Sequence, residues 1–184
     1  SNTDALMLSG ETASGKYPLE AVETMAAIAE QAENDRQHFG HKEDIPLMSN
    51  CTQKEFLAHT AINSTRLLGV EGIITDSETG ETARNLASFR GPKPILAICY
   101  KEKTQRWLNL SYGVIPVYQK EHQNADFMFL AALRMLRQKG YLTDDDKVAY
   151  LSGSLGEGGG TTFVEINQVK KAFDEKYQFH LPKV

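Results

Sequence analysis

Hydroxyl and glycine residues gather between residues 75 and 82, where a short apolar run gives way to helical spacing. The segment reads Thr-Asp-Ser-Glu-Thr-Gly-Glu-Thr. The start of a helix carries unpaired backbone N–H groups and the positive end of the helix dipole, and nearby hydroxyls add donors, so such a junction can hold a phosphate. Ser, Thr and Asp are also favoured at the start of a helix as capping residues, without any ligand. The local sequence is compatible with both interpretations.

The same segment carries three carboxylates, Asp76, Glu78 and Glu81. Like charges at close range in partly dry surroundings repel strongly, so these side chains oppose a bound anion. We therefore expect a candidate phosphate site whose electrostatics are unfavourable.

A second candidate is the glycine-rich segment 152–162, Ser-Gly-Ser-Leu-Gly-Glu-Gly-Gly-Gly-Thr-Thr. Glycines permit positive φ angles and close approach of the backbone to a ligand. The segment is not a Walker phosphate loop, because the lysine and the required spacing are absent. A flexible connection between two strands explains the same composition, so both interpretations stay open.

The beginning of the chain combines an apolar run at 5–8, a Ser-Gly-Glu-Thr turn at 9–12 and Pro18 ahead of helical spacing. The apolar run is typical of a parallel strand buried on both faces, which requires neighbouring strands. Little sequence precedes it, so we expect a strand at 5–8 whose partners are missing because the chain is truncated. An ordinary strand-to-helix loop, with Pro18 near the first helical position, is the alternative for the turn.

Composition narrows the classes of function. The 184 residues carry a net charge of −4, which argues against a general nucleic-acid binder. No apolar run approaches the roughly 20 residues of a membrane span, and the beginning lacks the pattern of a signal peptide. Two cysteines are too few for a disulfide framework and indicate a reducing compartment, and the five histidines show no zinc-like spacing, so we expect no metal site.

From residue 52 onward, helical and strand patterns alternate, which predicts a mostly parallel α/β sheet. The predicted helices are 52–68, 79–90, 103–110 and 126–139, and the strands are 72–75, 94–99, 114–118, 147–152 and 162–166. An earlier helix is predicted at 19–34. The expected architecture is a three-layer α/β/α domain at 52–168 with a five-stranded sheet and an antiparallel last strand. Residues 36–51 are interpreted as a linker, and 169–184 as an extension that forms a surface helix and a loose end or a partner-binding segment.

Two long stretches resemble one enzyme family. Residues 9–16, followed by Tyr-Pro-Leu-Glu-Ala-Val, closely resemble the last strand, turn and helix of the pyruvate kinase barrel. Residues 52–168 resemble the C-terminal domain of pyruvate kinase in the same element order, including Ile74-Thr75, Phe89-Arg90 and Gly160-Thr161-Thr162. The resemblance implies that residues 1–35 are a remnant of the (β/α)8 barrel.

The resemblance also implies a reaction that this chain cannot complete. The family transfers a phosphoryl group from phosphoenolpyruvate to ADP with Mg²⁺ and commonly K⁺. Loops after barrel strands build the active site, so Ser9, Glu11 and Thr12 would lie at its rim. The family's catalytic lysine and metal-binding carboxylates would lie upstream. We therefore expect this chain alone to be inactive and to bind no cofactor.

For regulation, segment 75–82 matches the one that binds the phosphate of a sugar-phosphate effector in many family members. The implied effector-binding residues are Thr75, Ser77, Thr79, Gly80 and Thr82, and, from the glycine loop that would close over the effector, Gly158, Gly159, Gly160 and Thr161. A basic residue of the preceding helix often holds a second phosphate, and its nearest match here is Phe129. A sugar monophosphate or a nucleotide is therefore the expected effector rather than a bisphosphate.

The family is usually homotetrameric and cytoplasmic, so a homo-oligomer is expected, with neither nucleic acid nor membrane as a partner. One alternative has no kinase parent at all. An independent α/β module that binds a small molecule or a protein without catalysis would explain both loops.

Overall fold

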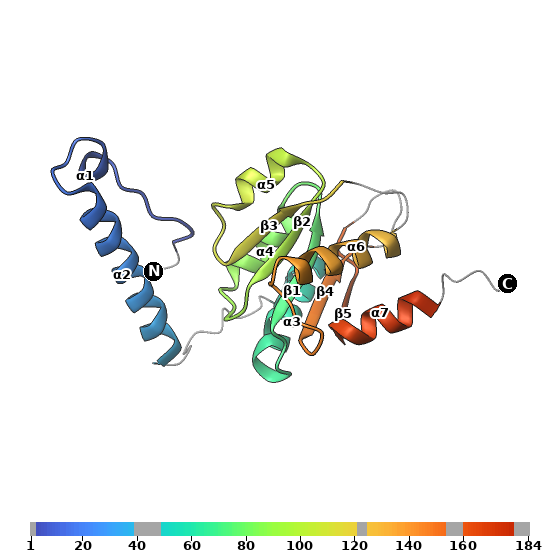
Figure 1. Cartoon of the computed structure of the whole chain (residues 1–184). Coiled ribbons are helices and arrows are strands. Elements are labelled where there is room, and N and C mark those ends of the chain that lie inside the picture. Colours follow the sequence, from blue (N-terminus) through green and yellow to red (C-terminus); the bar gives the residue numbers. More distant parts are fainter. Residues whose placement is uncertain (1–2, 39–48, 121–124, 154–159, 179–184) are drawn as a thin grey trace. The chain divides into compact units, whose positions relative to one another are not determined.

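The computed structural model describes residues 3–38, 49–120, 125–153 and 160–178 (Figure 1). The chain divides into two compact units, formed by residues 3–46 and residues 47–184. In the described parts of both units, no helix is long and apolar enough to cross a membrane.

The first unit consists of a single helical turn, α1 (Gly10–Ala13), and a long helix, α2 (Pro18–His38). Pro18 starts α2 because its missing N–H would have no intrahelical partner at that position. The helix predicted at 19–34 is confirmed and extends to His38. The strand predicted at 5–8 is wrong, since these residues form no ladder. A strand needs hydrogen bonds to a neighbour, and no segment of residues 3–38 forms a strand with which residues 5–8 could pair.

The second unit is organised around one five-stranded sheet. Its strands are β1 (Gly72–Ser77), β2 (Ile95–Cys99), β3 (Val114–Tyr118), β4 (Lys147–Ser152) and β5 (Phe163–Gln168). Their order is β3-β2-β1-β4-β5, with β5 antiparallel to β4 and every other pair parallel. The predicted mostly parallel sheet with an antiparallel last strand is confirmed.

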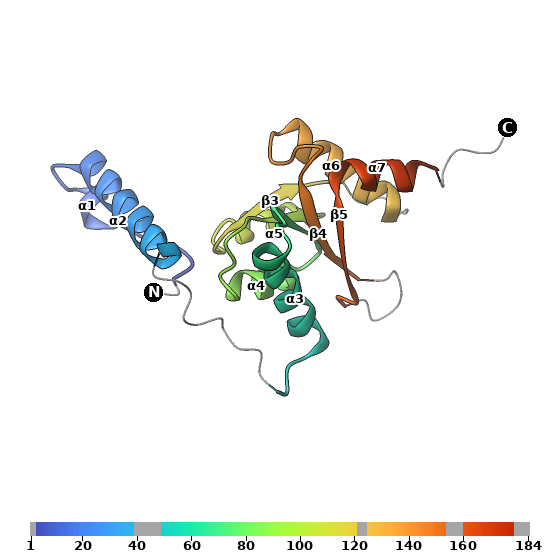
Figure 2. The same ribbon diagram turned by 90° about the horizontal axis from the view of Figure 1, so that it is seen from below.

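Helices cover both faces of this sheet (Figure 2). One layer contains α3 (Gln53–Leu67), α4 (Glu81–Ser88) and α5 (Glu102–Leu108), and the other contains α6 (Ala125–Gln138) and α7 (Val169–Gln178). A parallel strand is reached through a crossover that is almost always right-handed, so helices change face where the chain reverses direction across the sheet. That reversal occurs between β3 and β4, and it places α6 opposite α4 and α5.

The core between the sheet and the α6–α7 layer is made by alternate strand residues. Ile74, Leu96 and Val148 project into it from three adjacent strands and meet Leu133 and Leu136 of α6. Helix α7 contributes Val169 and Ala172, both buried. The surface helix predicted after residue 168 therefore also belongs to the core, while residues 179–184 lie outside the described residues.

The first prediction concerns this core. Replacing fully buried Leu136 by Ala should lower the free energy of unfolding by about 2–5 kcal/mol, because it removes buried methyl groups and leaves a cavity. Leu67→Ala is the matched control, because that side chain is 80% exposed at the end of α3. Urea unfolding followed by circular dichroism measures both, and equal effects would contradict the packing described.

Candidate functional site

The two segments rich in hydroxyls and glycine meet at one edge of the sheet. Strands β1 and β4 are parallel neighbours, yet the chain leaves β1 toward β2 on one side and reaches β4 only after β3. Ligands of open α/β sheets bind outside the carboxyl ends of the strands at such a switch point. Residues 78–82 follow β1, and residues 153–161 follow β4. Strand order alone thus brings the two candidate segments together.

The turn after β1 is shaped by its own side chains. The Gly80 N–H donates a 2.8 Å hydrogen bond to Ser77 Oγ, and the Glu81 N–H lies 3.4 Å from Thr79 Oγ1. Gly80 has a φ of 84°, a conformation that favours glycine. A Cβ there would also lie 2.8 Å from Arg84 Nη1. Ser77, Thr79 and Gly80 therefore fix the entry into α4, and this capping role needs no ligand.

The two ends of the glycine loop after β4 lie close to each other. A Cβ on Gly153 would collide with the Gly160 carbonyl oxygen, so only glycine fits where the two ends meet. Just beyond this neck, Thr161 Oγ1 lies 3.1 Å from Thr82 Oγ1 in α4, within hydrogen-bond distance. This contact joins the two candidate segments directly. Gly158 and Gly159 lie outside the described residues.

Thr75 and Asp76 sit inside β1 rather than in the turn. Thr75 is fully buried, and its hydroxyl donates a 3.2 Å bond to the Asp76 carbonyl. Burial raises the pKa of the Asp76 carboxyl above its ordinary value, although a hydrogen bond from Ser152 on β4 lowers it in part. The partly buried position of Asp76 beside β4 therefore disfavours the ionised form of its carboxyl.

Two of the three carboxylates near the turn have lysine partners. Glu78 pairs with Lys101, and this lysine lowers the pKa of the Glu78 carboxyl. Glu81 pairs with Lys54, with Nζ and Oε1 3.1 Å apart. The unfavourable electrostatics expected from the sequence are therefore reduced by cations from α3 and from the N-cap of α5.

Lys54 is the site residue that sequence reasoning missed. It lies in the first turn of α3, whose start is fixed by a capping box between Thr52 and Glu55. A cation is disfavoured at the positive end of a helix. That misplacement was the signal available in the sequence, but the partner of Lys54 lies 27 positions away along the chain.

Phe129 lies in α6 and is buried in the core, with its ring centroid 4.2 Å from that of Tyr150. An aromatic core side chain thus occupies the position at which the resemblance implies a basic residue in many family members. Phe129 therefore cannot supply the positive charge that would bind a second phosphate.

Ser9, Glu11 and Thr12 belong to the first unit and form a self-contained turn. The Thr12 hydroxyl donates to the Ser9 carbonyl at 3.2 Å, and the Ser9 N–H donates to Glu11 Oε2 at 3.0 Å. Backbone N–H groups of Glu11 and Ser9 lower the pKa of the Glu11 carboxyl. In the parts of the chain that the structure describes, no three His, Cys, Asp or Glu side chains gather as a metal site.

The sheet order and the two loops at its switch point define the class: a doubly wound α/β domain with its candidate site at the carboxyl edge of the strands. The family model "Pyruvate kinase, alpha/beta domain" matches residues 55–167. The chain belongs to the pyruvate kinase family, and the alternative of a module unrelated to any kinase is wrong.

Known relatives agree with this assignment. A pyruvate kinase from Borreliella burgdorferi is 37% identical over 173 residues, which cover 92% of this chain and 36% of that protein. One from Bacillus licheniformis is 34% identical over 89% of this chain and 28% of its own length. The crystal structure of a pyruvate kinase from Cryptosporidium parvum superposes with a TM-score of 0.74 at 26% identity, covering 89% of this chain and 32% of that one. The chain thus spans about a third of the length of the relatives it matches.

The second prediction concerns Asp76. Since the folded state raises the pKa of this carboxyl above its ordinary 3.8, the fold binds the proton more tightly than the unfolded chain does. The contribution of the Asp76 carboxyl to the free energy of unfolding is therefore fully present below pH 3.8. It is lost as the pH rises through the pKa of the folded state. Asp76→Asn should raise the melting temperature at pH 7 more than at pH 4. A difference that is constant over this range in calorimetry would contradict it.

Proposed function

We propose that this chain is the regulatory and assembly domain of a pyruvate kinase. The complete enzyme would transfer a phosphoryl group from phosphoenolpyruvate to ADP, giving pyruvate and ATP. Family membership supports this proposal, as do the two pyruvate kinases compared above, each of which is about three times as long as the matched region.

The chain by itself would not catalyse this reaction. Phosphoryl transfer depends on metal ions and cations positioned around the moving phosphoryl group. Among the described residues, no three His, Cys, Asp or Glu side chains gather as a metal site. Those ions would be held by other parts of the complete enzyme.

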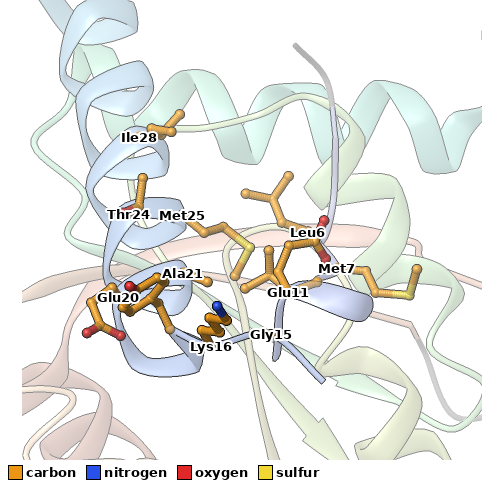
Figure 3. A pocket seen from close by; sticks show the side chains of 12 residues that line it. Leu6, Met7, Glu11, Gly15, Lys16, Glu20, Ala21, Thr24, Met25 and Ile28 are labelled. Carbon is orange, nitrogen blue, oxygen red and sulfur yellow. The ribbon is translucent and has the colours of Figure 1, made fainter. Parts of the chain in front are cut away.

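Residues 1–35 would be the last strand and helix of the catalytic barrel, joined by the linker 36–51 to the domain at 52–168 and its extension at 169–184. An apolar groove of 710 Å³ supports this proposal (Figure 3). Its walls include Leu6, Met25 and Ile28, and Figure 3 shows Met25 of α2 extending toward Leu6. Leu6 and Ile28 are largely exposed. In the barrel, residues 5–8 would acquire the neighbouring strands that they lack here.

The carboxyl edge of the sheet would bind a phosphorylated effector between the turn 77–82 and the glycine loop. The observation that carries this proposal is the contact between Thr82 and Thr161, because it brings one hydroxyl from each segment to the same point. The first turn of α4 adds backbone N–H donors. With Phe129 buried in the core, one phosphate position remains, which favours a sugar monophosphate or a nucleotide.

An effector bound there would act by favouring one arrangement of subunits. Such coupling requires a different affinity for two global states of the assembly. We place the complete enzyme in the cytoplasm as a homotetramer, in which this domain supplies one subunit interface and contacts neither nucleic acid nor membrane.

The third prediction tests the effector site. In calorimetric titrations of this chain, glucose 6-phosphate or AMP should bind, and fructose 1,6-bisphosphate should bind no more tightly. Thr82→Val should weaken binding about tenfold, because it removes a hydroxyl at the phosphate position. Ser88→Ala is the control, since this hydroxyl lies exposed at the other end of α4. Flat titrations with all three compounds would refute the site.

The fourth prediction tests the absence of catalysis. The purified chain should show no pyruvate formation from phosphoenolpyruvate and ADP with Mg²⁺ and K⁺ in a coupled assay. Turnover that co-purifies with the chain and is absent from a mock purification would refute this part of the proposal.

A further inference from the structure

Two helix starts meet at the carboxyl edge of the sheet. Helix α4 follows β1 and α3 precedes it, so both begin at the end of the unit where β1 finishes. Their first turns carry Lys54 and Glu81, whose Nζ and Oε1 atoms lie 3.1 Å apart. The positive ends of two helix dipoles and one ammonium group therefore surround one carboxylate.

Lys54 departs from the charge preference of helix N-termini, whereas Glu81 follows it. An acidic side chain is stabilised in the first turn of a helix, whereas a basic one is destabilised there. Departures from local preference are expected at functional sites. The ion pair with Glu81 offsets the cost of placing Lys54 at the start of α3, and it fixes the ammonium group over the start of α4.

Lys54 also reaches the glycine loop. A Cβ at Gly160 would lie 3.0 Å from Lys54 Cε and 3.9 Å from its Nζ. The lysine stem therefore passes over the neck of the loop, next in sequence to Thr161, which contacts Thr82. Lys54 is thus a cation that touches both segments of the proposed effector site.

We propose that Lys54 is the phosphate-binding cation of this site and that Glu81 is its internal competitor. Without effector, Glu81 holds Lys54. A phosphate monoester that enters between Thr82 and Thr161 replaces the Glu81 carboxylate as the partner of Lys54. The inference rests on the effector site proposed above, and it adds the residue that sets both affinity and preference for one phosphate.

The exposure of the pair permits this exchange. The Lys54 and Glu81 side chains are 40% and 54% exposed, so both can rotate without unfolding a helix. An exposed ion pair is worth little and is weakened by salt. A phosphate dianion carries more charge and more acceptor oxygens than a carboxylate, so it competes successfully for the same ammonium group.

The test uses glucose 6-phosphate and this 184-residue chain, with calorimetry for affinity and ³¹P NMR for the ionisation of the bound phosphate. Lys54→Met should weaken binding about tenfold, Lys54→Arg should retain most of it, and Glu81→Gln should strengthen it several-fold. Lys93→Met is the matched control, because Lys93 pairs with Glu71 at the opposite edge of the sheet with similar exposure. The second pKa of the bound phosphate should rise in Lys54→Met and stay unchanged in Lys93→Met.

The outcomes separate the two proposals. If the unaltered chain binds and Lys54→Met binds equally well, the role of Lys54 is overturned while the effector site stands. If Lys54→Met weakens binding and leaves the phosphate pKa unchanged, its effect is structural and the inference is again overturned. If the unaltered chain does not bind, the effector site fails, and the inference that rests on it fails with it. Binding by the unaltered chain that Glu81→Gln leaves no stronger overturns the role of Glu81 as the competitor.

Discussion

The structure of the second unit depends on one constraint: a sheet of parallel strands must be covered on both faces. Each parallel pair requires a crossover, and the crossovers α4, α5 and α6 supply the cover that the strands need. Because each of these helices begins where a strand ends, helix N-termini gather at the carboxyl edge of the sheet. The hydrophobic requirement of the core thus creates a positive edge before any ligand is considered.

The charges at that edge show how the fold uses this field. Glu78 and Glu81 lie where a negative charge is favoured. Glu78 forms an ion pair with Lys101, and Glu81 forms one with Lys54 of α3. Asp76 shows the opposite case, because burial raises the pKa of its carboxyl. Neighbouring carboxylates on one short segment thus have different partners and surroundings, which a count of charges along the sequence could not reveal.

The two units differ in how far their sequences specify structure alone. The second unit contains every strand that its sheet needs, so its alternating patterns predicted all five strands and the antiparallel last one. In the first unit, helix α2 forms because its hydrogen bonds are internal. The apolar run at 5–8 has strand character but no ladder partner among residues 3–38, and the strand does not form.

The sequence by itself determined the order of helices and strands, the two segments at 75–82 and 152–162, and the membership in a family of kinases, because these follow from local spacing and residue type. Only the tertiary structure decided what those segments face. The strand order brought Thr82 to Thr161, and the packing of α3 beside α4 brought Lys54 to Glu81. Contacts between residues 79 and 27 positions apart depend on how layers pack, and no local pattern encodes that distance.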